Sequence, residues 1–195
     1  MNHPYTESYF KNVNYTNYLD REAKYTKTAE DLNKLFESLT IVDKNSRILD
    51  YGCAVGFLVS SLSNLNYCNV IGYDISDWAI SKAKERGCKI LDKVEDTRFD
   101  LVFFLDVLEH MTDAQIINLF KKNHFKIIIV RIPCSEECNS REFFLDISKQ
   151  DPTHINCKTK KEWKKFMKKL GYNHSFKLNL NTIYDSAGCF CYLFM

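Results

Sequence analysis

The side chains best placed to do chemistry begin where a short apolar run ends. That run leads into Asp50, and the chain then passes through Gly52 and Gly56 into a helical pattern. Glycine is needed where the backbone approaches a ligand closely or takes positive φ, and a strand, a glycine turn and a helix form a common nucleotide cradle. Dinucleotide sites have a further glycine where this chain has Ala54. A carboxylate at Asp50 would repel a pyrophosphate, so the pattern favours a positively charged ligand.

Two further carboxylates follow apolar runs in the same way. Asp74 ends the run 69–73, and Asp106 ends the run 99–105 and precedes a Leu-Glu-His sequence. In doubly wound sheets, an acidic residue at the end of the second strand accepts hydrogen bonds from ribose hydroxyls. Because ligands bind at the carboxyl ends of parallel strands, we expect Asp50 and Asp106 to lie at the same site.

These three segments together resemble the motifs of class I S-adenosylmethionine-dependent methyltransferases. The segment 50–56 matches the family's Asp/Glu-x-Gly-x-Gly-x-Gly motif except at Ala54, and the segment 99–110 resembles its fourth motif, Phe-Asp-x-Val followed by Leu-Glu-His. The resemblance covers residues 47–110. It implies an enzyme that uses S-adenosylmethionine, releases S-adenosylhomocysteine and methylates an oxygen or nitrogen of a small-molecule acceptor.

The resemblance also assigns cofactor-binding residues. It gives Asp74 the ribose hydroxyls and places the apolar Ile75 on the adenine. The full set predicted to bind the cofactor is Asp50, Gly52, Cys53, Gly56, Asp74, Ile75, Asp92, Asp106, Tyr15 and Arg21.

Two residues are candidates for catalysis. His154 ends an Asp-x-Thr-His run, titrates near neutral pH and could take a proton from a hydroxyl or amine, with Asp151 orienting it. The alternative is a turn over 151–153 with His154 packed or capping. Asp106 is the second candidate, and its alternative role is to cap the residues after it. Methyl transfer requires neither a metal nor a covalent intermediate, so no metal site is expected.

Composition fits one domain. The 195 residues are 45% hydrophobic and 27% charged, with a net charge of +2, typical of a globular protein and uninformative about partners. The eight cysteines are scattered without a C-x-x-C pair, which favours reduced thiols in a cytoplasmic protein over a zinc site. The first residues lack a secretory pattern, and no run reaches the eighteen apolar residues that suggest a membrane span, so no membrane partner is expected.

The alternation of apolar runs and helical patterns predicts an α/β fold. The resemblance makes it a Rossmann-like, seven-stranded, mostly parallel sheet with an antiparallel last strand and helices on both faces. Residues 46–195 would form this domain. Strands are expected at 47–51, 69–74, 88–91, 100–106, 125–132, 174–181 and 188–195, and helices at 56–65, 77–86, 113–123 and 159–170. The short stretch 92–98 leaves no room for the usual helix between the third and fourth strands.

Residues 1–45 have a different character. Six aromatic residues lie in a polar stretch up to residue 25, and the segment 26–39 has the apolar spacing of an amphipathic helix. In the family such a segment often folds over the cofactor as a lid. In this chain we expect Tyr15 or Tyr18 to touch the ligand and Arg21 to meet the methionine carboxylate. The alternative is that the tyrosines pack on the outside of the sheet.

Three other functions share single features with this sequence. The lysine-rich helix 159–170 could hold an RNA or protein target, but its apolar residues fall on one face and favour a core-docked helix, so a nucleic-acid partner is possible but not favoured. A non-catalytic subunit that binds S-adenosylmethionine is compatible with the first motif. A nicotinamide oxidoreductase is disfavoured by Ala54 and by the Leu-Glu-His sequence.

Overall fold

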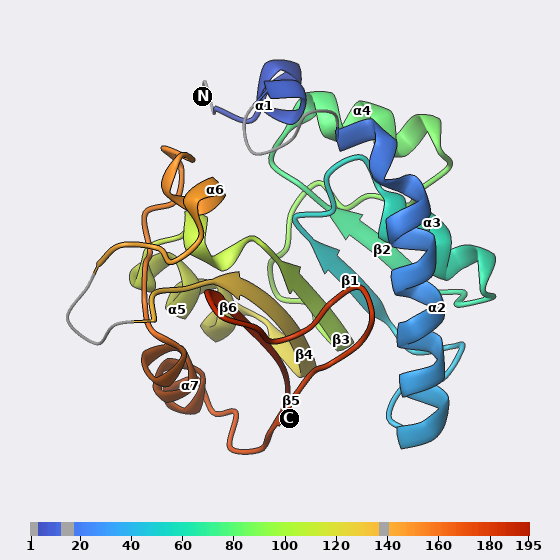
Figure 1. The fold of residues 1–195 in the computed structure, drawn as a ribbon. Coiled ribbons are helices and arrows are strands. Elements are labelled where there is room, and N and C mark those ends of the chain that lie inside the picture. The colour runs from blue at the N-terminus through green and yellow to red at the C-terminus, as the bar shows by residue number, and fades with distance from the viewer. Residues whose placement is uncertain (1–3, 13–17, 137–140) are drawn as a thin grey trace.

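The protein is built around one mixed β-sheet (Figure 1). The computed structural model describes residues 4–12, 18–136 and 141–195, and within them the sheet has six strands in the order β2-β1-β3-β4-β6-β5. β1 to β4 are parallel, and β6 runs antiparallel between β4 and β5. The strands are β1 (Ile48–Tyr51), β2 (Val70–Tyr73), β3 (Arg98–Leu105), β4 (His124–Pro133), β5 (Ser175–Lys177) and β6 (Cys189–Phe194).

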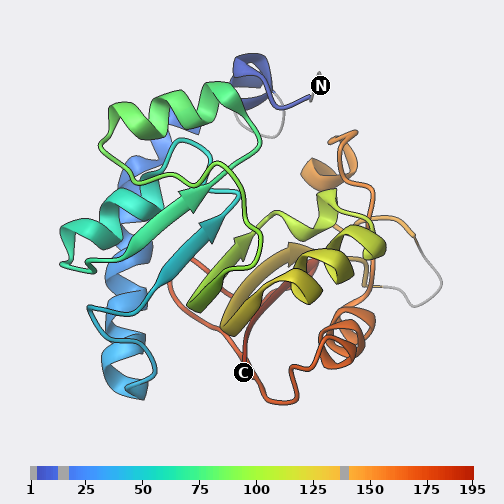
Figure 2. The same cartoon turned by 180° about the vertical axis from the view of Figure 1, so that it is seen from behind.

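Helices cover both faces of the sheet, as predicted (Figures 1 and 2). α2 and α3 pack on one face, and α5 and α7 pack on the other. The helices are α1 (Glu7–Asn12), η1 (Tyr18–Arg21), α2 (Glu22–Leu39), α3 (Phe57–Asn64), α4 (Asp77–Glu85), η2 (Leu108–His110), α5 (Asp113–Lys122), α6 (Asp146–Lys149) and α7 (Lys160–Lys169). None of the helices in the described ranges is long and apolar enough to cross a membrane.

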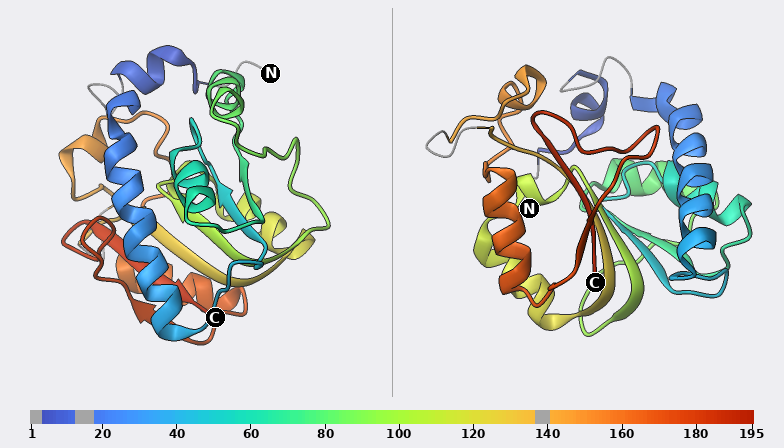
Figure 3. Two further views of the ribbon diagram at one scale, coloured as in Figure 1. Left: turned by 90° about the vertical axis from the view of Figure 1, so that its right-hand side faces the viewer. Right: turned by 60° about the horizontal axis from the view of Figure 1, so that its bottom comes forward.

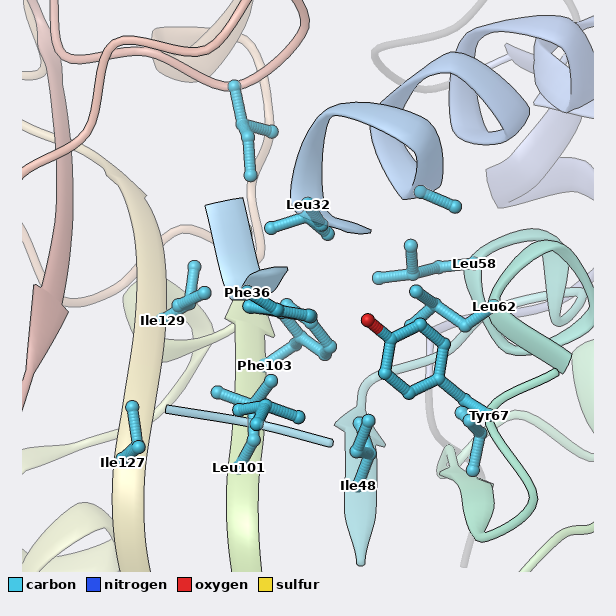
Figure 4. Packing of buried hydrophobic residues seen from close by; sticks show 14 of the residues in the cluster. Leu32, Phe36, Ile48, Leu58, Leu62, Tyr67, Leu101, Phe103, Ile127 and Ile129 are labelled. Atoms are coloured by element: carbon cyan, nitrogen blue, oxygen red, sulfur yellow. The ribbon is translucent and has the colours of Figure 1, made fainter. Parts of the chain in front are cut away.

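Continuous apolar strands produce these two layers because successive side chains point to opposite faces. In β3, Leu101 and Phe103 pack toward α2 and α3, whereas Val102 and Phe104 pack toward α5 and α7. Figure 4 shows the first of these layers, in which Phe36 of α2 lies over the strands. Each fully buried side chain of this kind contributes roughly 1.5–3 kcal/mol to folding.

The predicted count of seven strands is not confirmed. Residues 88–91 form only an isolated bridge, in which Gly72 donates to Lys89 and its carbonyl accepts from Leu91. This segment lies beyond β2 at the sheet edge, and one bridging residue does not extend into a ladder. The connection 92–97 contains no helix, as expected.

The end of the chain follows the prediction more closely. β6 is antiparallel to β4, which confirms the reversed last strand, although the preceding strand spans 175–177 rather than 174–181. α7 begins at a capping box in which Thr159 and Glu162 satisfy each other's backbone N–H groups. Its Trp163 is fully buried, so the apolar face of α7 docks on the core.

The N-terminal segment lies across one end of the sheet. α1 runs beside α4 (Figure 3), and the rings of Phe10 and Trp78 stack with centroids 5.2 Å apart. Tyr18 is buried and stacks on Phe57 at the start of α3, at 5.8 Å. Tyr15, one of the tyrosines predicted to touch the ligand, lies outside the described residues.

Candidate active site

A cavity of about 810 Å³ opens at the carboxyl ends of β1 to β4. Its walls come from the loops after these strands, from the N-terminal segment and from residues 145–154 and 181–189. Those of the predicted site residues that line it are Asp50, Gly52, Cys53, Asp74, Ile75, Asp106, Arg21 and His154.

The loop after β1 has a tight turn with positive φ angles, and hydrogen bonds to the end of β2 hold it in place. Gly52 has φ of 81°, and a Cβ atom there would collide with the side chain of Val107. The N–H groups of Gly52 and Cys53 both donate to the carbonyl of Tyr73, at 2.7 and 2.9 Å. Ala54 also has positive φ, 48°, which in a non-glycine residue costs energy that the surrounding contacts must offset.

Asp74 secures this loop from the end of β2. Its Oδ2 accepts the Ala54 N–H and its Oδ1 accepts the Ser76 N–H, each at 2.8 Å. The next residue, Ile75, is 50% exposed and lines the cavity. The predicted strand-end carboxylate therefore faces the cavity while it also organises the glycine loop.

Asp50 is a buried carboxyl group on the cavity wall. Burial, followed by the nearby charge of Asp74, raises the pKa of Asp50 to about 7. An ionised carboxylate in this position is costly unless positive charge comes close to it. The site is thus suited to a cationic ligand, as the sequence pattern suggested.

Asp106 forms an ion pair with a residue that sequence reasoning did not single out. Its carboxylate accepts two hydrogen bonds from the Arg131 guanidinium, the one from Nε to Oδ1 measuring 2.9 Å. The Asp106 N–H donates to the Arg131 carbonyl at 2.7 Å, and Asp106 has φ of 58°. Burial, then the neighbouring Arg131 and Arg21, lowers the pKa of Lys24, which also lines the cavity.

His154 lies in a cluster with His110 and Glu109 on the same wall. The two imidazole rings stand edge to face with centroids 4.6 Å apart, and Glu109 is completely buried. Burial lowers the pKa of both histidines, that of His110 to about 4, and raises the pKa of Glu109 well above its usual range. The carbonyl of Glu109 accepts the N–H groups of Ile155 and Asn156 at 2.9 Å, which fixes His154 against η2.

Asp151, which was expected to orient His154, has several partners in this cluster. Its Oδ1 accepts the N–H and hydroxyl of Thr153 at 2.9 and 2.5 Å, and its Oδ2 accepts the hydroxyl of Tyr9 at 2.8 Å. Oδ2 also lies 3.5 Å from Nε2 of His154. The residues 151–153 do form a turn, and His154 is packed within it while still lining the cavity.

Two predicted cofactor residues lie elsewhere. A Cβ atom at Gly56 would meet the Cys88 sulfur at 2.6 Å, so this glycine allows α3 to approach its neighbours and does not line the cavity. Asp92 is exposed and is also outside the cavity lining.

Seven of the eight cysteines lie in the described ranges, and all seven are free thiols. Cys53 is the one predicted as a cofactor residue, and it lines the cavity. Burial, then the Asp50 charge, raises its pKa well above the usual range, so it remains a neutral thiol there.

Comparison with known proteins decides the family. The profile of a family described as a methyltransferase domain matches residues 19–174. The chain belongs to this methyltransferase family. The match confirms the resemblance to class I S-adenosylmethionine-dependent enzymes that the motifs carried. No curated protein matches the chain.

Solved structures place this methyltransferase in the same fold. A SAM-dependent methyltransferase from Archaeoglobus fulgidus is 16% identical, with a TM-score of 0.61 over 91% of this chain and 98% of its own. The methyltransferase domain of bacterial CtHen1-CN is 19% identical, with a TM-score of 0.59 over 88% and 99%. Magnesium protoporphyrin IX methyltransferase from Synechocystis PCC 6803, solved with bound SAM, is 15% identical, with a TM-score of 0.57 over 88% and 78%.

Proposed function

We propose that this methyltransferase transfers a methyl group from S-adenosylmethionine to an oxygen or nitrogen atom of a small molecule bound in the cavity. One observation carries the proposal: a single cavity is lined by the two strand-end carboxylates Asp50 and Asp74 and by the histidine cluster beyond Asp106. A positively charged methyl donor suits the two carboxylates, and a methyl acceptor suits the histidine cluster.

The residues present fit the cofactor. Asp50 is a buried carboxyl group whose pKa is raised by burial, and a cation beside it would offset that cost. Gly52 keeps the loop open to a ligand, Asp74 faces the cavity for ribose hydroxyls, and the exposed Ile75 offers an apolar surface for a base. Arg21 lines the same cavity and is the proposed partner of the cofactor carboxylate. When bound, S-adenosylmethionine supplies the methyl group from its sulfonium.

A small acceptor is favoured by the size and cover of the site. Ligand pockets typically measure about 300–1,000 Å³, and this cavity of about 810 Å³ must hold both the cofactor and the acceptor. Tyr5, Tyr9 and Phe10 line it, which supports the proposed lid role for the first part of residues 1–45, whereas α2 packs on the sheet. A lid excludes water from the transfer and holds the reacting atoms together.

His154 is the proposed acceptor-side catalytic residue. Its Nδ1 donates to the Ser148 carbonyl at 2.9 Å, so Nε2 is the nitrogen that is able to take a proton. Asp106 is held by Arg131, and its proposed role is to position the acceptor-side wall together with that arginine.

An RNA or protein acceptor held by α7 is the second candidate. Except for Lys160, which bonds Asp185, the lysines of α7 are exposed whereas Trp163 is buried, and exposed lysines are what a basic docking surface needs. However, among the described residues that line the cavity, none belongs to α7. The small-molecule acceptor therefore has the stronger support.

The test is formation of S-adenosylhomocysteine by the full chain. The purified protein is incubated with S-adenosylmethionine and either a panel of small hydroxyl and amine compounds or pools of RNA and protein. We expect turnover with at least one small compound and none above background with the macromolecular pools. Turnover with a macromolecular pool alone would contradict the small-molecule proposal and favour the α7 alternative.

A further inference from the structure

The carboxylate of Glu109 is an anomaly in the cavity wall. Glu109 is completely buried, and neither of its carboxylate oxygens has a hydrogen-bond partner among the described residues. Buried carboxylates are ordinarily paired, because leaving such a group unsatisfied costs several kcal/mol. Two ring nitrogens lie near Oε1 of Glu109: Nε2 of His154 at 3.9 Å and Nε2 of His110 at 4.0 Å.

The hydrogen bonds of the two rings fix which nitrogen of each carries a proton. Nδ1 of His154 lies 2.9 Å from the Ser148 carbonyl, and a carbonyl only accepts, so the proton is on Nδ1. Nδ1 of His110 lies 2.9 Å from the Thr153 hydroxyl and 3.2 Å from its carbonyl. Since that hydroxyl donates its own proton to Asp151, Nδ1 of His110 must donate as well. In the neutral rings, both Nε2 atoms are therefore unprotonated and lie near the Glu109 carboxyl group, and Nε2 of His154 also lies 3.5 Å from Oδ2 of Asp151.

A cation placed among the lone pairs of the two Nε2 atoms and the buried carboxyl group would offset the cost of ionising that group. The separations of 3.9 and 4.0 Å are too long for hydrogen bonds, so a shared proton does not join these groups as they stand. The ligand atoms of the three residues all lie within 4.8 Å of one another. Atoms that bind one ion at about 2.1 Å stand roughly 3.0–3.4 Å apart, so side-chain shifts of about half an ångström to one ångström would close the shell.

We propose that Glu109, His110 and His154 bind a divalent first-row transition-metal ion in the wall of the cavity. Two imidazoles and one carboxylate are a ligand set for ions such as Mn²⁺, Fe²⁺ or Zn²⁺, whereas Mg²⁺ and Ca²⁺ prefer oxygen ligands. The backbone and Thr153 contacts at the Nδ1 atoms are the outer-shell hydrogen bonds that orient histidine ligands. This proposal revises the expectation that no metal takes part.

The proposed ion would serve the acceptor. All three ligands line the cavity, so coordination positions that the protein leaves open would face the acceptor side. An acceptor hydroxyl is a fitting ligand there, and a bound cation makes such an oxygen easier to deprotonate. With the ion bound, Nε2 of His154 is a ligand rather than a proton acceptor. This consequence rests on the proposed function, whereas ion binding itself does not.

Mn²⁺ alone is the probe, because the free cysteines would compete for softer ions. The full-length protein is titrated with Mn²⁺, and the loss of the free-ion electron paramagnetic resonance signal is followed. We expect one ion per chain, displaced by Zn²⁺ and not by equal Mg²⁺. Glu109→Gln and His154→Gln should each weaken Mn²⁺ binding more than about 100-fold. Loss of a group that only orients a ligand costs up to about 100-fold, and loss of a ligand itself should cost more. The matched control His124→Gln changes an exposed histidine and should bind as the unaltered protein does.

Circular dichroism and calorimetric binding of S-adenosylhomocysteine show which variants remain folded. Absence of Mn²⁺ binding by the unaltered protein would overturn the proposal, as would equal binding by both folded ligand variants. Because the titration contains no acceptor, a failed methyl-transfer assay with intact Mn²⁺ binding would count against the proposed function alone.

Discussion

The Tyr9 hydroxyl donates a hydrogen bond of 2.8 Å to Oδ2 of Asp151, across 142 positions of the chain. It joins α1 to the turn that carries His154, so the N-terminal segment and the acceptor side of the cavity are mechanically connected. Both oxygens of Asp151 are engaged, the other by Thr153. Opening or closing of α1 would therefore change the position of the turn that carries His154.

Tyr9→Phe should loosen the lid. Loss of a hydrogen bond to a charged group costs about 1 kcal/mol or more. Here the loss should mainly lower the free energy of local opening of residues 4–12. We expect faster amide hydrogen exchange in that segment and weaker S-adenosylhomocysteine binding, by roughly fivefold. Tyr67→Phe, which removes a hydroxyl bonded to Asn33 away from the cavity, is the matched control. Unchanged exchange in Tyr9→Phe would show that the hydrogen bond does not hold the lid.

Asp50 should make the stability of the ligand-free protein depend on pH. Burial raises the pKa of Asp50 to about 7, far above its usual value of 3.8. The folded state therefore binds this proton more tightly than the unfolded state does, and the contribution of Asp50 to stability falls as pH rises from about 4 to 7. Urea unfolding should show Asp50→Asn gaining stability relative to the unaltered protein over that range. A difference that is constant from pH 4 to 8 would contradict the raised pKa.

Asp74→Ala should weaken cofactor binding by about tenfold or more, because a hydrogen bond from a ribose hydroxyl to a carboxylate contributes roughly 1.5–3 kcal/mol. The substitution also removes the acceptors of the Ala54 and Ser76 N–H groups, so thermal stability is recorded beside affinity. Asp77→Ala, at an exposed position in the same segment, is the control. Unaltered affinity in calorimetry would remove the ribose assignment.

Arg131→Met should destabilise the fold by about 1–3 kcal/mol, because it leaves the Asp106 carboxylate without its partner. The cost is smaller than for a fully buried pair, since the two side chains keep 15% and 25% of their exposure. Urea unfolding of Arg131→Met, Asp106→Asn and the double variant measures the coupling directly. Additive effects in that cycle would mean that the pair contributes little.

His154→Ala should lower turnover by about 100-fold or more, as loss of a proton acceptor or of a metal ligand would. Its Nδ1 and Nε2 contacts are to the acceptor-side cluster, so affinity for S-adenosylhomocysteine should stay within about twofold. His174→Ala, at an exposed position, is the control. A parallel loss of cofactor affinity would point to a folding role for His154.

The sequence predicted the cavity wall at the glycine loop better than the wall at the histidine cluster, for a physical reason. Asp50, Gly52 and Asp74 are local features: each follows an apolar strand, and parallel strands bring their ends to one edge. The register of β1 and β2 then places them together without further information. The isolated bridge at 88–91 shows where local pattern fails, because pairing at a sheet edge depends on the neighbouring strand.

The wall at the histidine cluster depends on contacts that no spacing reveals. Arg131 meets Asp106 only because β3 and β4 are neighbours in parallel register, 25 positions apart in sequence. Glu109 stood within a recognised motif, yet its complete burial became visible only in the fold. Tyr9 and Asp151 lie 142 positions apart in the chain. The adjacent Glu109 and His110 were the one signal available in the sequence, and without knowledge of their burial this pair looks like part of a surface helix.

The central claim, that the loop after β1 holds the cofactor, is tested most directly by a crystal structure of the protein with S-adenosylhomocysteine. We expect ordered density for the nucleoside between Gly52 and Asp74, with the ribose on the Asp74 carboxylate and the sulfur toward the histidine cluster. Density for the ligand at another place on the protein, with this loop empty, would contradict it.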